Sequence, residues 1–288
     1  MLEGRKNARR LEFIEFQLTW RGRVGRADLQ DQFSISPQQA TNDLSEYSEL
    51  APRNLRYDPR QRTYVRDERF RPRLTRGSPL DYLTQLELCA ADYRNRSEIW
   101  PDPVPQFETM TTTTRPVARE TLQLMLSAIE TGGILEMQYV SLSSDDEEVR
   151  RIAPHALAND GHRWHARAYD LDKERHSDFV LSRLDAVAVS EGGGEAVPDD
   201  KAWNTLVTVK LQPEDGLGDR QRERLEIEYG MDDGRMDLTV RKAMLYYYLR
   251  HYGFDPRPVR GKTMRNVSSF RLAIANIQEV EKNLERRS

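Results

Sequence analysis

Cysteine is nearly absent from this sequence, since Cys89 is the only one among 288 residues. A single thiol excludes a disulfide framework and any zinc site built on several cysteines. No apolar run approaches the length that crosses a membrane, and the N-terminal residues lack an apolar signal core. We therefore expect a cytoplasmic protein with no membrane contact.

The usual nucleotide-binding and catalytic signatures are also missing: there is no P-loop, no dinucleotide fingerprint and no nucleophile elbow. The histidines at 155, 162, 165 and 176 crowd into one stretch. No pair of them has the i, i+4 spacing of a zinc-binding helix, and Arg163 and Arg167 would repel a cation. We expect no metal, no cofactor and no catalytic residue. A nucleic-acid-processing enzyme that uses this histidine-rich strand stays open as an alternative.

Charge is distributed unevenly along the chain. The whole sequence has a net charge of −3, whereas residues 1–76 hold 16 Lys and Arg against 11 Asp and Glu, a net of +5. A basic N-terminal module on an acidic body is expected where only one end meets nucleic-acid phosphate. The length suits several domains, which we place at residues 1–76, 77–131 (a helical linker), 132–192 and 203–288.

Residues 7–76 have the pattern of a winged helix-turn-helix: three short helices, then a hairpin that turns at Asp58-Pro59. The third helix begins at Ser36-Pro37-Gln38-Gln39, where Ser is an N-cap, Pro suits the first helical position and Gln39 is placed to close a capping box. This helix runs to about Glu49 and would lie in the major groove. Its inward residues are Ala40, Leu44 and Tyr47.

The outward polar side chains of that helix would read base edges, because Asn and Gln pair with adenine and Ser and Thr contact base or phosphate. They are Gln38, Gln39, Thr41, Asn42 and Ser45. Arg60 and Arg62, at the hairpin tip, would reach phosphates or the minor groove. Further phosphate partners are Arg5, Lys6, Arg9, Arg10, Arg21, Arg23 and Arg26. The alternative is a small helical domain whose polar face is merely solvated.

Periodicity predicts the remaining elements. Helices are expected at 80–93 and 116–131. Strands of the middle unit are expected near 135–141, 149–154, 163–170, 178–184 and 186–190. The last unit is expected to combine strands at 206–211 and 235–240 with helices at 219–229 and 243–251 and a charged C-terminal helix.

The strand expected at 163–170 has an unusual face. Side chains of a strand alternate, so one face carries Arg163, His165, Arg167 and Tyr169, and the other carries Trp164, Ala166 and Ala168. Such a polar row suits an anion, because the planar guanidinium group of arginine donates paired hydrogen bonds to phosphate or carboxylate. We expect a ligand pocket here. Alternatively, the row pairs with the acidic loop at 145–148 or with a partner subunit.

Five segments of the chain resemble those of a known family: Ser36–Leu44, Tyr139–Ser141, Ile152–His155, Arg163–Tyr169 and Phe179–Leu184. The chain resembles the WYL-domain transcriptional regulators, and most closely the winged-helix repressors of phage-defence islands of the BREX and CBASS type. The resemblance covers nearly the whole chain. The triplet Trp-Tyr-Leu that names the family is here Trp164-His165-Ala166, a departure that leaves the ligand chemistry open.

The resemblance implies an α+β multidomain fold with a winged helix-turn-helix, an Sm-like five-stranded β-barrel and an α/β extension. It also implies a homodimer and a nucleotide or nucleic-acid-like effector. On this basis we expect residues 1–76 to bind DNA, residues 132–192 to sense the ligand and residues 203–288 to be a C-terminal extension for dimerisation. By position, the pocket would be formed by Tyr139, Ser141, His155, Arg163, His165, Arg167 and Arg183. We interpret the chain as a repressor of a phage-defence operon that binds an inverted repeat in double-stranded DNA. A transcriptional activator with the same parts and a structural adaptor that binds DNA without sequence preference are the alternatives.

Overall fold

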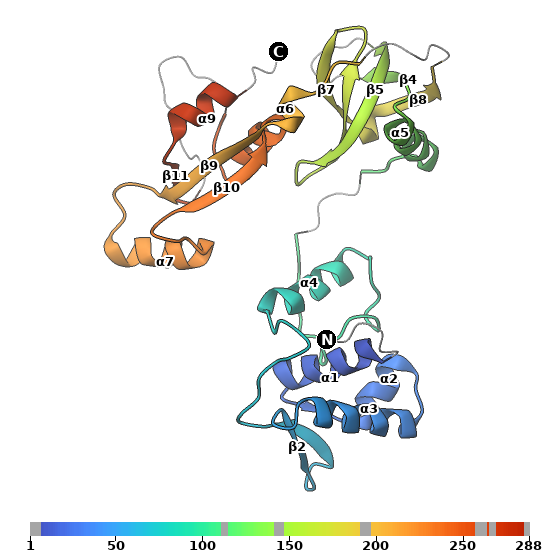
Figure 1. Cartoon of the computed structure of the whole chain (residues 1–288), viewed down its shortest axis with the longest axis vertical. Coiled ribbons are helices and arrows are strands. Elements are labelled where there is room, and N and C mark those ends of the chain that lie inside the picture. Colours follow the sequence, from blue (N-terminus) through green and yellow to red (C-terminus); the bar gives the residue numbers. More distant parts are fainter. Residues whose placement is uncertain are drawn as a thin grey trace. The chain divides into compact units, whose positions relative to one another are not determined.

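The computed structural model describes residues 7–110, 115–140, 147–190, 197–256, 264 and 269–284. The chain divides into two compact units, Met1–Thr113 and Thr114–Ser288 (Figure 1). No helix in the described part of the chain combines the length and the apolar character needed to cross a membrane.

The first unit contains the predicted helices and hairpin. Its helices are α1 (Ala8–Trp20), α2 (Arg26–Phe33) and α3 (Pro37–Leu50). Its strands are β1 (Arg23–Val24), β2 (Leu55–Asp58) and β3 (Thr63–Arg66), which form an antiparallel sheet in the order β1-β3-β2. Leu11, Leu29 and Leu44, one from each helix, are almost fully buried in a common core. The β2–β3 hairpin protrudes from this core as the wing (Figure 1).

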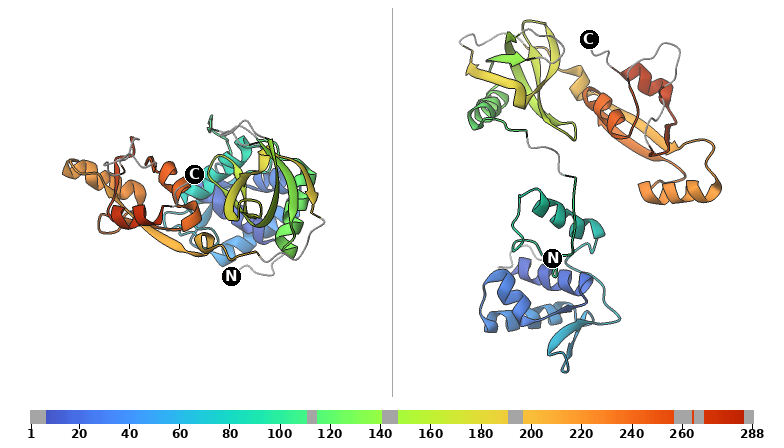
Figure 2. Two further views of the ribbon diagram at one scale, coloured as in Figure 1. Left: turned by 90° about the horizontal axis from the view of Figure 1, so that it is seen from above. Right: turned by 180° about the vertical axis from the view of Figure 1, so that it is seen from behind.

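Helix α4 (Pro79–Ala90) follows the wing and ends earlier than the sequence predicted. The chain then returns to α1, where Gln17 Nε2 donates a hydrogen bond to Trp100 O at 2.7 Å. The Trp100 ring lies edge-on to Phe13 and Phe16, with centroids 5.9 Å and 5.5 Å away. These contacts hold Trp100 against α1, and residues 79–102, which the sequence assigned to a linker, belong to the first unit (Figure 2).

The second unit begins with helix α5 (Arg119–Thr131), which ends at Gly132, where φ of +70° favours glycine. Met125 of α5 is buried against Ile152, Ala166 and Ala168 of the sheet beside it. Five antiparallel strands form this sheet in the order β7-β6-β5-β4-β8. They are β4 (Leu135–Val140), β5 (Glu147–Asn159), β6 (Trp164–Asp170), β7 (Arg175–Val180) and β8 (Leu184–Val189).

The number of strands is the one predicted, but the Sm-like barrel is not confirmed. Strands β7 and β8 are the two ends of the strand order, and no pairing joins them among the described residues. No closed barrel is therefore seen in the part of this domain that the structure describes.

A three-stranded sheet in the order β10-β9-β11 follows in the same unit. Val207, Val209 and Leu211 alternate inward along β9 and are buried. The elements are α6 (Lys201–Asn204), β9 (Leu206–Pro213), α7 (Asp219–Tyr229), β10 (Met236–Arg241), α8 (Leu245–His251), β11 (Leu272–Ile274) and α9 (Ile277–Asn283). Neither α6 nor β11 was predicted, because each is only three or four residues long.

Candidate functional site

Helix α3, the expected DNA-reading helix, begins at a well-formed cap. Ser36 Oγ accepts a hydrogen bond from Gln39 N at 3.2 Å, and Pro37 occupies the first turn. The Gln39 side chain does not complete a capping box, because its Nε2 donates to Asp43 Oδ1 at 2.9 Å. The predicted helix start is confirmed, and the closed capping box is not formed.

Asp43 is a fully buried carboxylate on α3 that organises the side chains around it. Arg10 Nε lies 2.6 Å from Asp43 Oδ2, and Asn7 Nδ2 donates to Asp43 Oδ1 at 3.2 Å. Burial alone would raise the Asp43 pKa, but the hydrogen bonds from Arg10, Asn7 and Gln39 outweigh it and lower the pKa. Arg10 is therefore part of the fold rather than a spare partner for DNA phosphate.

Arg21 is engaged in the same way. Its Nη1 lies 2.8 Å from Asp28 Oδ1 and 3.0 Å from Asp102 Oδ2. Of the other predicted phosphate partners, Arg9, Arg23 and Arg26 are exposed, and Arg5 and Lys6 lie outside the described residues.

Three of the five predicted base-reading side chains form one exposed stripe along α3. Gln38, Asn42 and Ser45 are exposed and recur at helical spacing. Gln38 Nε2 donates to Asn42 Oδ1 at 3.1 Å. Gln39 and Thr41 are half-buried, and Thr41 Oγ1 donates back to Pro37 O at 2.9 Å. Because these three residues are predicted to read base edges, we call Gln38, Asn42 and Ser45 the base-reading stripe.

The wing presents the two predicted arginines at its tip. Asp58 Oδ1 accepts hydrogen bonds from Arg60 N at 2.9 Å and Gln61 N at 3.3 Å, which tightens the turn. Arg62 has a φ of +53° at the end of this turn. The side chains of Arg60 and Arg62 are exposed, so their charges remain available to a nucleic acid.

In the second unit, the polar row on β6 is buried rather than open. His165 and Arg167 are 3% and 4% exposed, whereas Trp164, on the face expected to be apolar, is 53% exposed. Ala166 and Ala168 lie in the core as predicted. The alternation along β6 is therefore correct from Ala166 to Ala168, but the polar face meets protein instead of water.

Two carboxylates cover Arg167. Its Nε and Nη2 donate to Asp200 Oδ2 and Oδ1 at 2.7 Å and 3.3 Å, and its Nη1 donates to Asp178 Oδ1 at 3.1 Å. The second oxygen of Asp178 accepts a hydrogen bond from Tyr247 Oη at 2.9 Å. Burial alone would raise the Asp200 pKa, but the hydrogen bonds from Arg167 and from Trp203 N bring the pKa to about 2.

Asp160 holds His165 at the other end of the row. His165 Nε2 lies 3.0 Å from Asp160 Oδ2, and Arg163 Nε lies 3.2 Å from the same oxygen. Burial alone would raise the Asp160 pKa, but hydrogen bonds from His165 and two backbone N–H groups lower the pKa to about 2. Burial lowers the pKa of His165 despite the nearby carboxylate. The His165 ring packs against Tyr247, with centroids 5.2 Å apart.

The structure also groups three possible metal ligands that the sequence did not connect: His155, His176 and Asp200. One ligand atom from each lies within 4.8 Å of the others. His155 Nε2 is 3.1 Å from Asp200 Oδ2. The guanidinium of Arg167 already occupies both Asp200 oxygens, and its positive charge opposes a cation at this point. Burial lowers the pKa of His176, which favours the neutral imidazole.

Two of the other predicted pocket residues, Tyr139 and Arg183, do not join this cluster. Tyr139 is half-buried on the α5 side of the sheet, where its ring lies edge-on to Phe179 with centroids 5.2 Å apart. Arg183 is half-buried in a short 3-10 turn. Ser141 and the loop positions 145 and 146 lie outside the described residues, and at 147 and 148 only the backbone is described.

Sequence reasoning missed the residues that cover the row, which are Asp160, Asp178, Asp200 and Tyr247. A signal existed for Asp178, because it shares one face of β7 with His176 at period two. Asp200 caps the short helix α6 by accepting from Trp203 N at 3.0 Å, but nothing local indicates that it also binds Arg167.

Three family models match the chain in series. The winged helix-turn-helix domain of the BrxR transcriptional regulator matches residues 6–88, the WYL domain matches 120–189, and the BrxR C-terminal dimerization domain matches 206–280. The first covers the base-reading stripe and the wing, and the second covers the β6 row.

Several curated relatives match over most of their length. The DNA-binding transcriptional repressor CapW of Stenotrophomonas maltophilia is 36% identical over 86% of this chain and 83% of its own. CapW of Escherichia coli is 33% identical over 96% and 93%. A proteasome accessory factor B/C structure from Arthrobacter aurescens is 15% identical with a TM-score of 0.32, over 96% of this chain and 46% of that one. The identity over most of both chains shows that this protein belongs to the CapW and BrxR family of winged-helix, WYL-domain transcriptional regulators.

Proposed function

We propose that the protein is a homodimeric repressor that binds an inverted-repeat operator in double-stranded DNA, at a phage-defence operon, and responds to an anionic effector of nucleotide or nucleic-acid type. The observation that carries the proposal is the base-reading stripe, an exposed row of amide and hydroxyl groups on the third helix of a winged-helix unit. The relatives named CapW are DNA-binding repressors, and the last family model is named for dimerization. Two copies of α3 in a symmetric dimer suit two half-sites.

The effector would act at Arg167. Because Asp178 and Asp200 already occupy its guanidinium, an anionic effector would have to displace a carboxylate. Displacing Asp200 would loosen α6, which leads directly into β9 of the C-terminal sheet. A coupling of about 1–3 kcal/mol between the effector and operator sites would be enough to change operator occupancy.

The burial of His165 argues against the enzymatic alternative. Its Nε2 is tied to Asp160, and its Nδ1 is buried without a hydrogen-bond partner among the described residues. A general base needs a nitrogen within hydrogen-bond reach of its substrate.

A gel-shift titration on the DNA upstream of the protein's own operon tests the proposal, with excess random competitor and light scattering to give the oligomeric state. Tight binding by a dimer that survives competitor supports a specific repressor. Binding that disappears with competitor contradicts it. Derepression of a reporter when the gene is deleted separates repressor from activator. The proposal that the protein responds to an effector is contradicted if no nucleotide or oligonucleotide changes the DNA affinity measured in this titration.

A further inference from the structure

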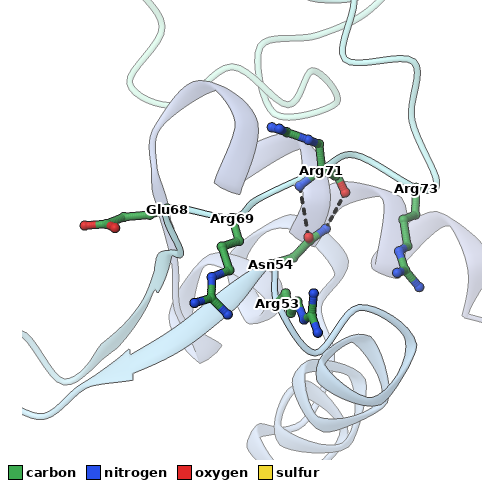
Figure 3. Close-up of a pocket in the computed structure, with 6 residues that line it drawn as sticks. All are labelled: Arg53, Asn54, Glu68, Arg69, Arg71 and Arg73. Atoms are coloured by element: carbon green, nitrogen blue, oxygen red, sulfur yellow. Dashed lines mark hydrogen bonds between the residues drawn. The ribbon is translucent and has the colours of Figure 1, made fainter.

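Beyond the base-reading stripe, the first unit carries a second basic feature. A hollow of about 420 Å³ is lined by Arg53, Asn54, Glu68, Arg69, Arg71 and Arg73 (Figure 3). We call it the arginine hollow. Arg53 lies three residues after the end of α3, and the other three arginines follow β3. Arg53 and Arg69 extend to the same side of the hollow, whereas Glu68 and Arg71 point away from them (Figure 3).

A buried polar network fixes the backbone that carries these arginines. Asn54, only 3% exposed, accepts a hydrogen bond from Arg71 N at 3.1 Å and donates to Arg71 O at 2.8 Å. The fully buried carboxylate of Glu15 accepts from the N–H groups of Arg73, Leu74 and Thr75 at 2.9, 2.7 and 2.7 Å. Loops on a protein surface are normally mobile. The hydrogen bonds that Glu15 accepts, which we call the Glu15 clamp, and those of Asn54 hold this loop in one conformation and so preorganise the hollow for a ligand.

The hollow carries an excess of positive charge. Within the residues that the structure describes, no carboxylate forms an ion pair with Arg53, Arg69, Arg71 or Arg73. Arg73 Nη1 donates to Leu50 O at 2.9 Å, which caps the C-terminal end of α3. Arg53 and Arg69 are exposed and have no such role. Four arginines and one carboxylate, that of Glu68, thus line the hollow, and the excess of positive charge favours an external anion.

We propose that the arginine hollow binds backbone phosphates of the DNA that α3 reads, with Arg53 and Arg69 as the main contacts. A helix in the major groove is flanked by the two phosphate strands, so cations just beyond its end meet the backbone rather than the bases. The hollow is open, and its guanidinium groups are exposed, which suits a polyanion more than a small enclosed anion. These residues would set the affinity and orientation of α3 without reading sequence. The inference rests on the proposed DNA-binding function.

The test compares full-length wild type with Arg53→Gln/Arg69→Gln in binding titrations on operator and random DNA at several salt concentrations. Each phosphate contact contributes about 0.9 to the slope of log affinity against log salt, and a dimer carries two copies of both arginines, so we expect the slope to become shallower by about 4. We expect affinity at 0.1 M salt to fall about 10- to 100-fold for each protomer that contacts the DNA, on both DNAs. The ratio of operator to random affinity should stay unchanged.

Two controls make the result specific. Arg94→Gln/Arg96→Gln removes the same charge from exposed positions of the same unit outside the hollow, and it should leave the slope unchanged. Arg53→Lys/Arg69→Lys keeps the charge and should restore most of the slope. Matching thermal melts would show that the exposed substitutions leave folding intact.

Each outcome decides something. An unchanged slope in the glutamine variant, with specific binding by wild type, overturns the hollow as a phosphate site but leaves the repressor proposal standing. An unchanged slope together with inorganic phosphate binding that the variant loses would assign the hollow to a free anion and also overturn it. Absence of DNA binding by wild type overturns both proposals. A changed operator-to-random ratio would mean that these arginines contact bases.

Discussion

Asp200 and Arg167 form a two-point ion pair between the segment leading into α6 and strand β6, with Nε–Oδ2 at 2.7 Å and Nη2–Oδ1 at 3.3 Å. Both side chains are about 5% exposed or less. The pair joins positions 33 residues apart in sequence and links the five-stranded sheet to the segment that enters the C-terminal sheet.

Replacing Arg167 with Gln should lower the free energy of unfolding by about 3–5 kcal/mol, because Asp178 and Asp200 would be left buried without their cation. Urea unfolding of the full chain measures this. Arg151→Gln is the matched control, since the Arg151–Asp172 pair is on the same sheet but nearly 40% exposed, and it should cost no more than about 1 kcal/mol. Equal losses of unfolding free energy in the two variants would show that the buried pairs of Arg167 stabilise the fold no more than an exposed ion pair does.

Stability should fall as the pH drops from 7.5 to 5.5, partly because of His165. Burial holds its pKa below the ordinary value of 6.5, so in this window the unfolded chain binds a proton that the folded protein does not. Protonation would also place an N–H on Nδ1, which is buried with no acceptor among the described residues.

His165→Gln keeps a donor near Asp160 but cannot titrate, so its melting temperature should change less with pH than that of wild type. His251→Gln, at an exposed position, serves as control and should follow wild type. Identical pH profiles for wild type and His165→Gln would rule out a contribution from this imidazole.

The first unit could be predicted from sequence because its signals are local. Ser36 and Pro37 fix the start of α3, and Asp58 with Pro59 fixes the hairpin turn, each through contacts within a few residues. What could not be predicted is which cations are already neutralised. Arg10 meets Asp43 across 33 residues of sequence, and no local pattern shows that pairing.

The polar row on β6 shows more clearly that tertiary contacts cannot be predicted from local sequence. Alternation along the strand correctly put His165 and Arg167 on one face, but periodicity does not say what covers a face. Tyr247 reaches Asp178 across 69 residues of sequence, and tertiary contacts of this kind bury the row. The cluster is therefore an internal network in this structure, and its role in effector binding stays a prediction.

Replacing Asn42 with Ala should weaken operator binding by about 1–3 kcal/mol per base-edge contact and leave random-DNA binding nearly unchanged. Asn42 is exposed in the middle of the base-reading stripe. Gln39→Ala should have a smaller effect on specificity, because its amide is bonded to Asp43 within the protein. Competition gel shifts measure both affinities. If operator and random affinities fall together for Asn42→Ala, α3 is not the base-reading element.

Replacing Glu15 with Gln should lower the free energy of unfolding of the first unit by about 2–4 kcal/mol. The carboxylate accepts the N–H groups of Arg73, Leu74 and Thr75 as well as the hydroxyl of Tyr47 at 2.9 Å. An amide offers one acceptor oxygen and directs its own N–H groups at those donors, so several buried donors lose their partner. Urea unfolding measures the loss.

The same substitution should also make DNA binding less dependent on salt, because Glu15 fixes the segment that carries Arg71 and Arg73. Glu12→Gln removes the same charge from the half-buried face of α1 and should change neither property. A loss of stability without any change in the salt slope would mean that the arginine hollow does not depend on the Glu15 clamp. An unchanged free energy of unfolding would show that the Glu15 carboxylate contributes little to stability, despite the hydrogen bonds that it accepts.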